Sequence, residues 1–257
     1  VTGLVFSCFT IYYPYRTLFS MPTYRRPLNE QQLAILTLLA RFRFGTSTLF
    51  ATSLNSTQRS LHKRLRILVE QEYIGKRYNT SYKLAGRSAE YYLLPKGIEV
   101  LATDDAYKPK LLKLLAKDQN ASERFVRHCL SILGARVQLK TIHGDALQFR
   151  TRSDYAGNEL FPQPLPDGYA FTETNCKRTH YFVECFDGTM PESVMRATIS
   201  KHIEFYDNDN WTSDLAYPTV VLICRDERLK IKVKKWVQKA VAEGWSDDVE
   251  FEILLAL

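Results

Sequence analysis

The order of hydrophobic and polar residues from residue 28 onward predicts three helices in close succession. Asn29 is of a type favoured at helix N-termini, and the residues after it repeat an apolar side chain with helical spacing. Residues 45–47 break this first helix, and Thr46 or Ser47 is placed to cap a short second helix that reaches Leu54. The apolar face of the first helix contains Leu33, Ile35, Leu36, Leu38 and Leu39.

A third helix is predicted from Gln58 to Gln71, opened by the capping sequence Asn-Ser-Thr at 55–57. Its apolar positions fall on one face, and basic or polar side chains fill the rest. A capped helix N-terminus and Lys or Arg side chains both suit phosphate groups, so this helix is the predicted DNA-reading element. The residues predicted to face the groove are Gln58, Arg59, His62, Lys63 and Arg66.

Two strand-like runs follow, at 73–78 and 90–94, on either side of a polar stretch that contains Lys83 and Arg87. Three helices and a two-stranded hairpin are the layout of a winged helix-turn-helix. In that fold the third helix enters the major groove and the wing contacts the DNA backbone. Lys83 and Arg87 are therefore predicted to contact phosphate. The alternative is a basic three-helix domain that binds another protein.

The remaining chain predicts a second, mixed domain. The run Val-Val-Leu-Ile at 220–223 is apolar at every position, which is typical of a strand buried on both faces of a sheet covered by helices. Helices are predicted at 121–133, 192–205 and 227–243. Strands are predicted at 137–142, 146–150, 168–172, 180–186, 218–224 and 249–255.

These patterns divide the chain into four parts. We predict an N-terminal extension at 1–27, a winged helix at 28–103, a linker with a short helix at 104–120, and an α/β domain at 121–257. Residues 1–20 are apolar and aromatic but have no basic segment of a signal peptide. Met21 is therefore expected to be the natural start, or Val1 to reflect an alternative start codon, and residues 1–20 contribute nothing to the fold prediction.

Charge is distributed unevenly over a chain whose net charge is +7. Residues 1–103 contain 14 Lys and Arg against 5 Asp and Glu, whereas residues 121–257 contain 17 against 20. A basic first half indicates a polyanionic partner, most simply duplex DNA, although a solvated basic surface would give the same count.

The five cysteines are scattered without a Cys-x-x-Cys pair, which argues against a zinc site or disulfide framework and favours the reducing cytoplasm. Since no stretch of about 18 apolar residues occurs, no membrane partner is expected.

Two short apolar strands near the middle of the second domain each carry one carboxylate. Asp167 follows a proline directly before one strand, and Glu184 interrupts the other. Mg²⁺ is commonly held by one or two carboxylates together with phosphate oxygens and water, so the pair suits a metal-dependent nuclease. Phe186 stands where such enzymes carry a lysine, and Lys201 on the following helix is the candidate replacement. If Glu184 is instead a buried structural carboxylate, it needs a partner, which Lys201 or Arg196 could supply.

The chain resembles the replication-relaxation proteins of bacterial plasmids and mobile elements. The resemblance rests on the winged-helix pattern and on a block that runs from Pro-Asp at 166–167 through Glu-x-x-Asp-Gly-Thr at 184–189 to Lys201. Family members tend to read Glu-x-Asp-Arg-Gly-Thr in the middle of this block, where this chain has Phe186 and Asp187. The resemblance implies a C-terminal restriction-endonuclease-like domain of the Pro-Asp…(Asp/Glu)-x-Lys type, and DNA binding linked to plasmid replication or mobilisation.

The expected fold is therefore α/β, α+β overall, with an N-terminal winged helix and a nuclease-like mixed sheet. The expected function is duplex DNA binding, with a nuclease-like domain that has lost activity. One alternative is a divergent nuclease in which Asp167 and Glu184 bind Mg²⁺ and Lys201 completes the site. Another is a module that recruits replication or transfer proteins. Many winged helices act as dimers, so a homodimer is possible, although no heptad run specifies one.

Overall fold

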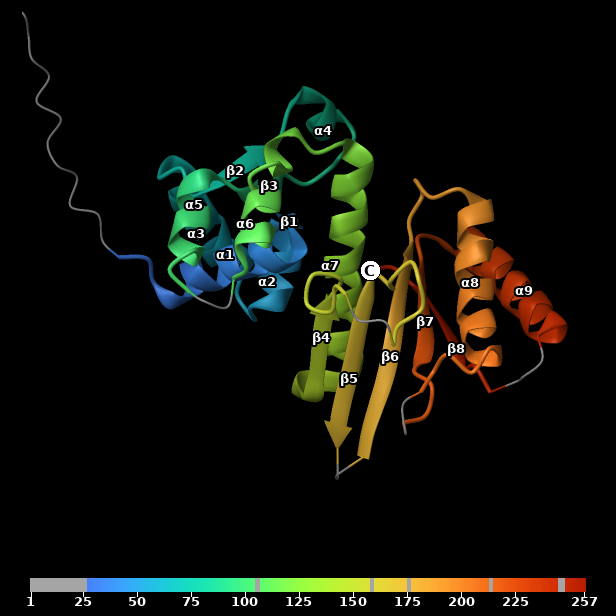
Figure 1. Ribbon diagram of the computed structural model, residues 1–257. Coiled ribbons are helices and arrows are strands. Elements are labelled where there is room, and N and C mark those ends of the chain that lie inside the picture. The colour runs from blue at the N-terminus through green and yellow to red at the C-terminus, as the bar shows by residue number, and fades with distance from the viewer. Residues whose placement is uncertain (1–26, 105–106, 158–159, 175–176, 213–214, 245–247) are drawn as a thin grey trace, which may run out of the picture.

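The computed structural model describes residues 27–104, 107–157, 160–174, 177–212, 215–244 and 248–257 (Figure 1). The predicted start at Met21 and the segment 1–20 lie outside these residues. The winged-helix part occupies one side of the molecule, a long helix runs through its centre, and a sheet with two further helices completes the other side.

The three predicted N-terminal helices are present as α1 (Glu30–Phe42), α2 (Ser47–Ser53) and α3 (Gln58–Glu70). Each begins at a polar cap. The side-chain oxygen of Asn29 accepts a hydrogen bond from the backbone N–H of Gln32 at 2.9 Å, and the Gln32 side chain accepts one from the Asn29 N–H at 3.0 Å. This reciprocal capping box satisfies two N–H groups that would otherwise lack partners. Thr46 and Thr57 cap α2 and α3.

The wing is built on β2 (Ile74–Arg77) and β3 (Glu90–Leu93), which pair antiparallel as predicted. Two features were not predicted. A third strand, β1 (Gly45–Thr46), pairs with the outer edge of β3, and the polar stretch of the wing contains a short helix, α4 (Thr80–Leu84). The side chain of Asn79 caps α4, and Tyr82 is buried beneath it, so the wing folds back onto the protein.

Helix α5 (Pro95–Leu101) follows the wing, and the predicted linker contains α6 (Pro109–Leu115) and the 3₁₀ turn η1 (Asp118–Asn120). Asp118 is fully buried, and both of its carboxylate oxygens accept hydrogen bonds from the Nε of Arg43 at 2.9 Å. This end of the segment therefore packs against the winged helix. The domain limits themselves stay a prediction.

Helix α7 (Glu123–His143) corrects one element of the sequence prediction. The strand predicted at 137–142 is wrong, because the helix continues through these residues and ends at Gly144, whose φ of 68° suits glycine. Buried residues alternate along this stretch: Leu133, Ala135, Val137 and Leu139. Apolar residues at every second position are typical of a strand, but here they arise because α7 is buried on two opposite faces, one against the winged helix and one against the sheet.

The second sheet has the order β4-β5-β6-β7-β8. The first three strands are antiparallel, and β7 and β8 run parallel to β6. Helix α7 covers one face and α8 (Glu192–Asp207) and α9 (Glu227–Glu243) cover the other (Figure 1). This mixed sheet covered by helices is the α/β architecture that was expected. The strands are β4 (Leu147–Thr151), β5 (Gly168–Thr174), β6 (Lys177–Phe186), β7 (Thr219–Cys224) and β8 (Phe251–Leu255).

The largest hydrophobic core passes through both parts of the molecule. It joins Leu36 and Leu65 of the winged helix to Leu139 of α7 and to Val183 and Val221 of the sheet. Two polar contacts support the same junction, an ion pair between Arg41 and Asp154 at 3.1 Å and a hydrogen bond from Arg77 to the Ala121 carbonyl at 2.8 Å. Helix α7 thus contributes to the core that joins both parts, so the five-stranded sheet also supports the winged helix.

Candidate functional site

The first candidate site is the outer face of α3. Leu61, Leu65 and Leu68 are buried, which turns the opposite face of the helix to solvent. Few of its polar groups are engaged elsewhere: Gln58 donates to the Thr48 hydroxyl at 3.3 Å, and Arg66 pairs with Glu70 at 3.5 Å. The residues predicted to face the DNA groove are all exposed: Gln58, Arg59, His62, Lys63 and Arg66.

A groove of about 610 Å³ separates α3 from the β2–β3 hairpin. One wall carries Gln58, His62 and Arg66 from α3. The other carries Lys76 and Tyr78, with the Lys76 ammonium 5.1 Å from the centre of the Tyr78 ring. The groove therefore combines basic side chains, an amide and a half-exposed aromatic ring, a composition that suits the backbone and base edges of a nucleic acid.

The two predicted wing residues differ in their surroundings. Lys83 on α4 is exposed. Arg87 lies 4.3 Å from the centre of the Tyr82 ring, and its guanidinium pairs with Glu90 at 2.8 Å and Glu123 at 2.5 Å. Arg87 thus attaches the wing to the start of α7, and two carboxylates compensate its charge, whereas no acidic partner of Lys83 occurs within the described residues.

The second candidate site surrounds Asp167 and Glu184. Gly168 pairs with Val183 across β5 and β6, so the two acids lie at the same end of this strand pair. Both side chains are buried, and their polar partners come from different elements. Asp167 forms an ion pair with Arg152 at 2.7 Å and accepts hydrogen bonds from His128 Nε2 of α7 at 2.9 Å and from the Cys185 backbone N–H at 2.8 Å.

His128 joins Asp167 to Asp187. Its Nδ1 lies 3.0 Å from Asp187 Oδ2, and Asp187 Oδ1 accepts from the backbone N–H of Thr189 at 2.7 Å. Burial alone would lower the pKa of His128, but its hydrogen bonds to the two carboxylates raise it to about 9. Burial opposes the ionisation of Asp187, yet bonds from His128 and Thr189 bring its pKa to about 2. His128 is therefore an imidazolium that donates from both ring nitrogens.

Glu184 points to the opposite side of the sheet, toward α8. Its Oε1 accepts from the Lys201 ammonium at 2.8 Å and from His202 Nε2 at 2.9 Å. Lys201 thus supplies the partner that the buried carboxylate needs, whereas Arg196 lies over the Trp236 ring instead. Burial alone would raise the pKa of Glu184, but the His202 hydrogen bond and the Lys201 charge lower it overall, so the group is ionised.

His202 is fully buried on α8, and burial lowers its pKa although Glu184 opposes this shift. The neutral ring fits its surroundings: Nε2–H donates to Glu184, and Nδ1 lies 3.0 Å from the Tyr217 hydroxyl, from which it accepts. The Glu184 site is thus one charged pair extended by a neutral histidine and a tyrosine.

These contacts do not fit a magnesium site made of Asp167, Glu184 and Lys201. Oδ1 of Asp167 is shared by Arg152 and His128, and Oε1 of Glu184 by Lys201 and His202. In the part of the chain that the structure describes, no three His, Cys, Asp or Glu side chains converge as metal ligands would. We therefore derive no metal-dependent step from this arrangement.

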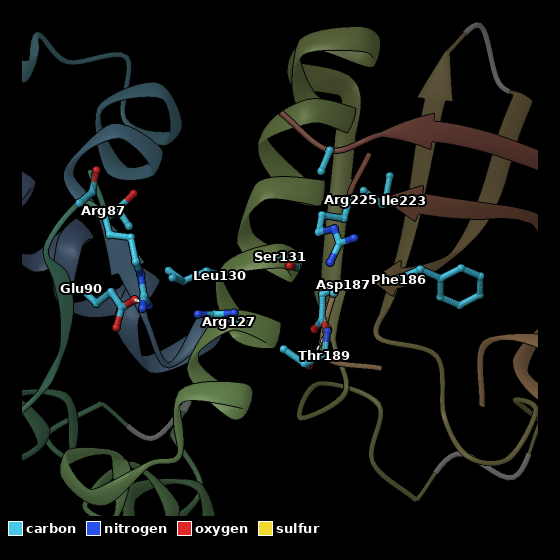
Figure 2. Close-up of a pocket in the computed structure, with 14 residues that line it drawn as sticks. Arg87, Glu90, Arg127, Leu130, Ser131, Phe186, Asp187, Thr189, Ile223 and Arg225 are labelled. Carbon is cyan, nitrogen blue, oxygen red and sulfur yellow. Dashed lines mark hydrogen bonds and ion pairs between the residues drawn. The ribbon is translucent and has the colours of Figure 1, made fainter. Parts of the chain in front are cut away.

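A cleft of about 430 Å³ lies beside Asp187, between the winged helix, α7 and the ends of β6 and β7. Figure 2 shows Arg127 and Ser131 of α7 and Arg225 near Asp187, with Arg87 and Glu90 on the winged-helix side. Each arginine here has an acidic partner, Glu123 for Arg127 at 2.6 Å and Asp226 for Arg225 at 2.7 Å. The cleft is therefore lined by charges that largely compensate one another.

Sequence reasoning missed four members of the buried charge clusters: His128, Arg152, Asp187 and His202. The sequence predictions assigned no role to His128, Arg152 or His202, and they named Asp187 only within the block that carries the family resemblance. One signal was available for His202, which directly follows Lys201. Arg152 and His128 come from a loop and a helix far from Asp167 in the chain, so no local pattern connects them.

No described helix is both long and apolar enough to span a bilayer. The sequence model of the replication-relaxation family matches residues 36–220, a span that runs from α1 into β7 and includes both candidate sites. No curated protein matches the chain.

Solved structures with similarity include a doubly substituted variant of ZitR from Lactococcus lactis, at 22% identity over 45% of this chain and 74% of that one, with a TM-score of 0.27. Another is the restriction endonuclease FokI, at 10% identity over 86% of this chain and 42% of that one, with a TM-score of 0.34.

Proposed function

This chain belongs to the replication-relaxation family, and we propose that it binds duplex DNA in the control of plasmid or mobile-element replication or mobilisation. The observation that carries the proposal is the exposed polar face of α3, where Arg59 and Lys63 have no acidic partner within the described residues. A helix that buries three leucines and turns basic side chains outward is suited to enter the major groove.

The groove beside α3 and the exposed Lys83 of the wing supply the remaining contacts of this proposal. Gln58, His62 and Arg66 lie along this groove and are placed to reach base edges, while Lys76 and the exposed Lys83 are placed to meet phosphates. Phosphate contacts supply affinity and register, and base contacts supply sequence preference. The buried ion pairs of the second domain then stabilise the sheet on which α7, and with it the winged helix, rests.

Removing one phosphate contact is expected to change the salt dependence of binding. Replacing Arg59 or Lys63 with Gln should weaken DNA binding and make the slope of log K against log salt concentration less negative by about 0.9. Fluorescence anisotropy with a labelled duplex over a range of salt concentrations measures this. Lys239→Gln is the matched control, because it removes the same charge from α9, at the far side of the molecule (Figure 1). An unchanged slope in both α3 variants would contradict the assignment of this helix.

A divergent magnesium-dependent nuclease remains the second function to test, since the Lys201 ammonium reaches Glu184. Supercoiled and linear DNA would be incubated with the protein and Mg²⁺ or Mn²⁺, beside Asp167→Ala and Glu184→Ala. We expect binding without cleavage, because both carboxylates are occupied by internal pairs. Cleavage that both substitutions abolish would favour the nuclease, and co-purification of a protein without any DNA affinity would favour a recruitment module.

A further inference from the structure

A third cavity carries an unbalanced positive charge that neither candidate site explains. It has a volume of about 200 Å³ and lies between the turn that joins α2 to α3 and the last turns of α7. Thr52 and Ser53 at the end of α2 and Asn55 in the turn line one side, and Arg136 and Lys140 of α7 line the other.

Arg136 is the first unusual group. Its guanidinium is partly buried, its Nη1 is enclosed and makes no hydrogen bond, and within the described residues no carboxylate pairs with it. The nearest aromatic group is the Phe42 ring, 5.8 Å away. Burial and the positive charge of Arg41 lower the pKa of Arg136, but an arginine stays protonated in proteins. A charge partly removed from water without a counter-ion is costly, which favours an anion beside Arg136.

Ser53 is the second unusual group. Its residue is 8% exposed, and its hydroxyl is enclosed without a hydrogen-bond partner. Other hydroxyls that line the cavity are engaged, since Thr52 and Thr141 each donate to a backbone carbonyl of their own helix. An unpaired guanidinium and an unpaired hydroxyl therefore line the same space, and both are donors that an oxyanion accepts from.

The other charged side chains at the cavity also leave it positively charged overall. The Lys140 ammonium adds a second cation, and its partner Asp145, 3.1 Å away, is 92% exposed on the rim. Arg41 forms an ion pair with Asp154 and acts on Arg136 only through the electrostatic effect of its charge. Liquid water occupies about 30 Å³ per molecule, so the cavity has room for several waters or for one tetrahedral oxyanion.

We propose that this cavity is a phosphate site, in which the Arg136 guanidinium, the Lys140 ammonium and the Ser53 hydroxyl bind one phosphate group. The group is either free inorganic phosphate or a phosphate of the DNA backbone. The site does not require that α3 binds DNA, because its donors come from α7 and from the end of α2.

Thermal unfolding in phosphate and in chloride at equal ionic strength tests the site. Ligand that binds only the folded state stabilises it, so Tm should rise by roughly 3 °C for each tenfold excess of phosphate over its Kd. Arg136→Met should abolish this rise. It should also leave Tm in chloride equal to or above that of the unsubstituted protein, since the variant removes an uncompensated charge while retaining an apolar side chain. That comparison separates a lost site from a lost fold.

Two controls complete the design. Lys140→Gln should weaken the phosphate effect, whereas Lys239→Gln on α9 should leave it intact. The source of the phosphate is tested by measuring how Arg136→Met binds the labelled duplex over a range of salt concentrations. A slope of log K against log salt concentration that is less negative by about 0.9 assigns the site to the DNA backbone. An unchanged slope assigns it to a free anion. Equal Tm in phosphate and chloride, together with an unchanged slope, overturns the proposal.

Discussion

Replacing Glu184 with Gln is expected to lower the free energy of unfolding by about 3–5 kcal/mol, the usual cost of breaking a buried ion pair at one partner. Glu184 and Lys201 are 4% and 11% exposed, so water screens the pair little. Gln keeps the shape of the side chain and its acceptor oxygen, and what is lost is the negative charge that compensates Lys201. Urea denaturation followed by circular dichroism measures the change.

A second substitution distinguishes charge from shape. Lys201→Met added to Glu184→Gln should recover part of the lost stability, because it removes the uncompensated ammonium and keeps an apolar chain of similar length. Lys232→Met provides the matched control, since its pair with Glu192 is about half exposed and such pairs contribute about 1 kcal/mol or less. A double variant no more stable than Glu184→Gln would show that the charge of Lys201 is not the cause.

Raising the pH from 6 to 10 is expected to destabilise the protein by up to about 3 kcal/mol through His128 alone. Its pKa is raised from 6.5 to about 9 in the folded state, and each pKa unit corresponds to about 1.4 kcal/mol. Because the folded-state pKa is higher, the contribution is complete below pH 6.5 and is lost as the pH rises through 9. The physical cause is the loss of the imidazolium that lies between Asp167 and Asp187.

The matched variant for this prediction is His128→Gln, which retains a donor but has no titrating charge. Urea unfolding at several pH values should show a smaller decline between pH 6 and 10 for the variant than for the unsubstituted protein. At acid pH the Asp187 contribution, with a pKa lowered from 3.8 to about 2, is present above 3.8 and is lost as the pH falls through 2. Parallel curves for the two proteins on the alkaline side would refute the role of His128.

Local elements of this chain were predictable because their causes are local. Asn29, Thr46 and Thr57 begin helices where capping chemistry places them, and the apolar run of β7 identifies a buried strand. The polar face of α3 follows directly from the positions of its leucines. The strand predicted at 137–142 was wrong because the cause of its pattern is not local. Helix α7 is buried on two faces, and its alternating apolar residues depend on neighbours that are distant in the chain.

The sequence by itself determined the two-part architecture, the exposed basic helix and the presence of carboxylates before β5 and within β6. Only the tertiary structure decided what those carboxylates do. A buried charge is costly unless it is paired. In the folded chain Asp167 contacts Arg152 and His128, and Glu184 contacts Lys201 and His202. The same packing leaves Arg136 without such a partner among the described residues. The sequence named Lys201 as a candidate partner of Glu184, whereas the contacts of Arg152, His128 and His202 join separate elements that no local pattern along the chain connects.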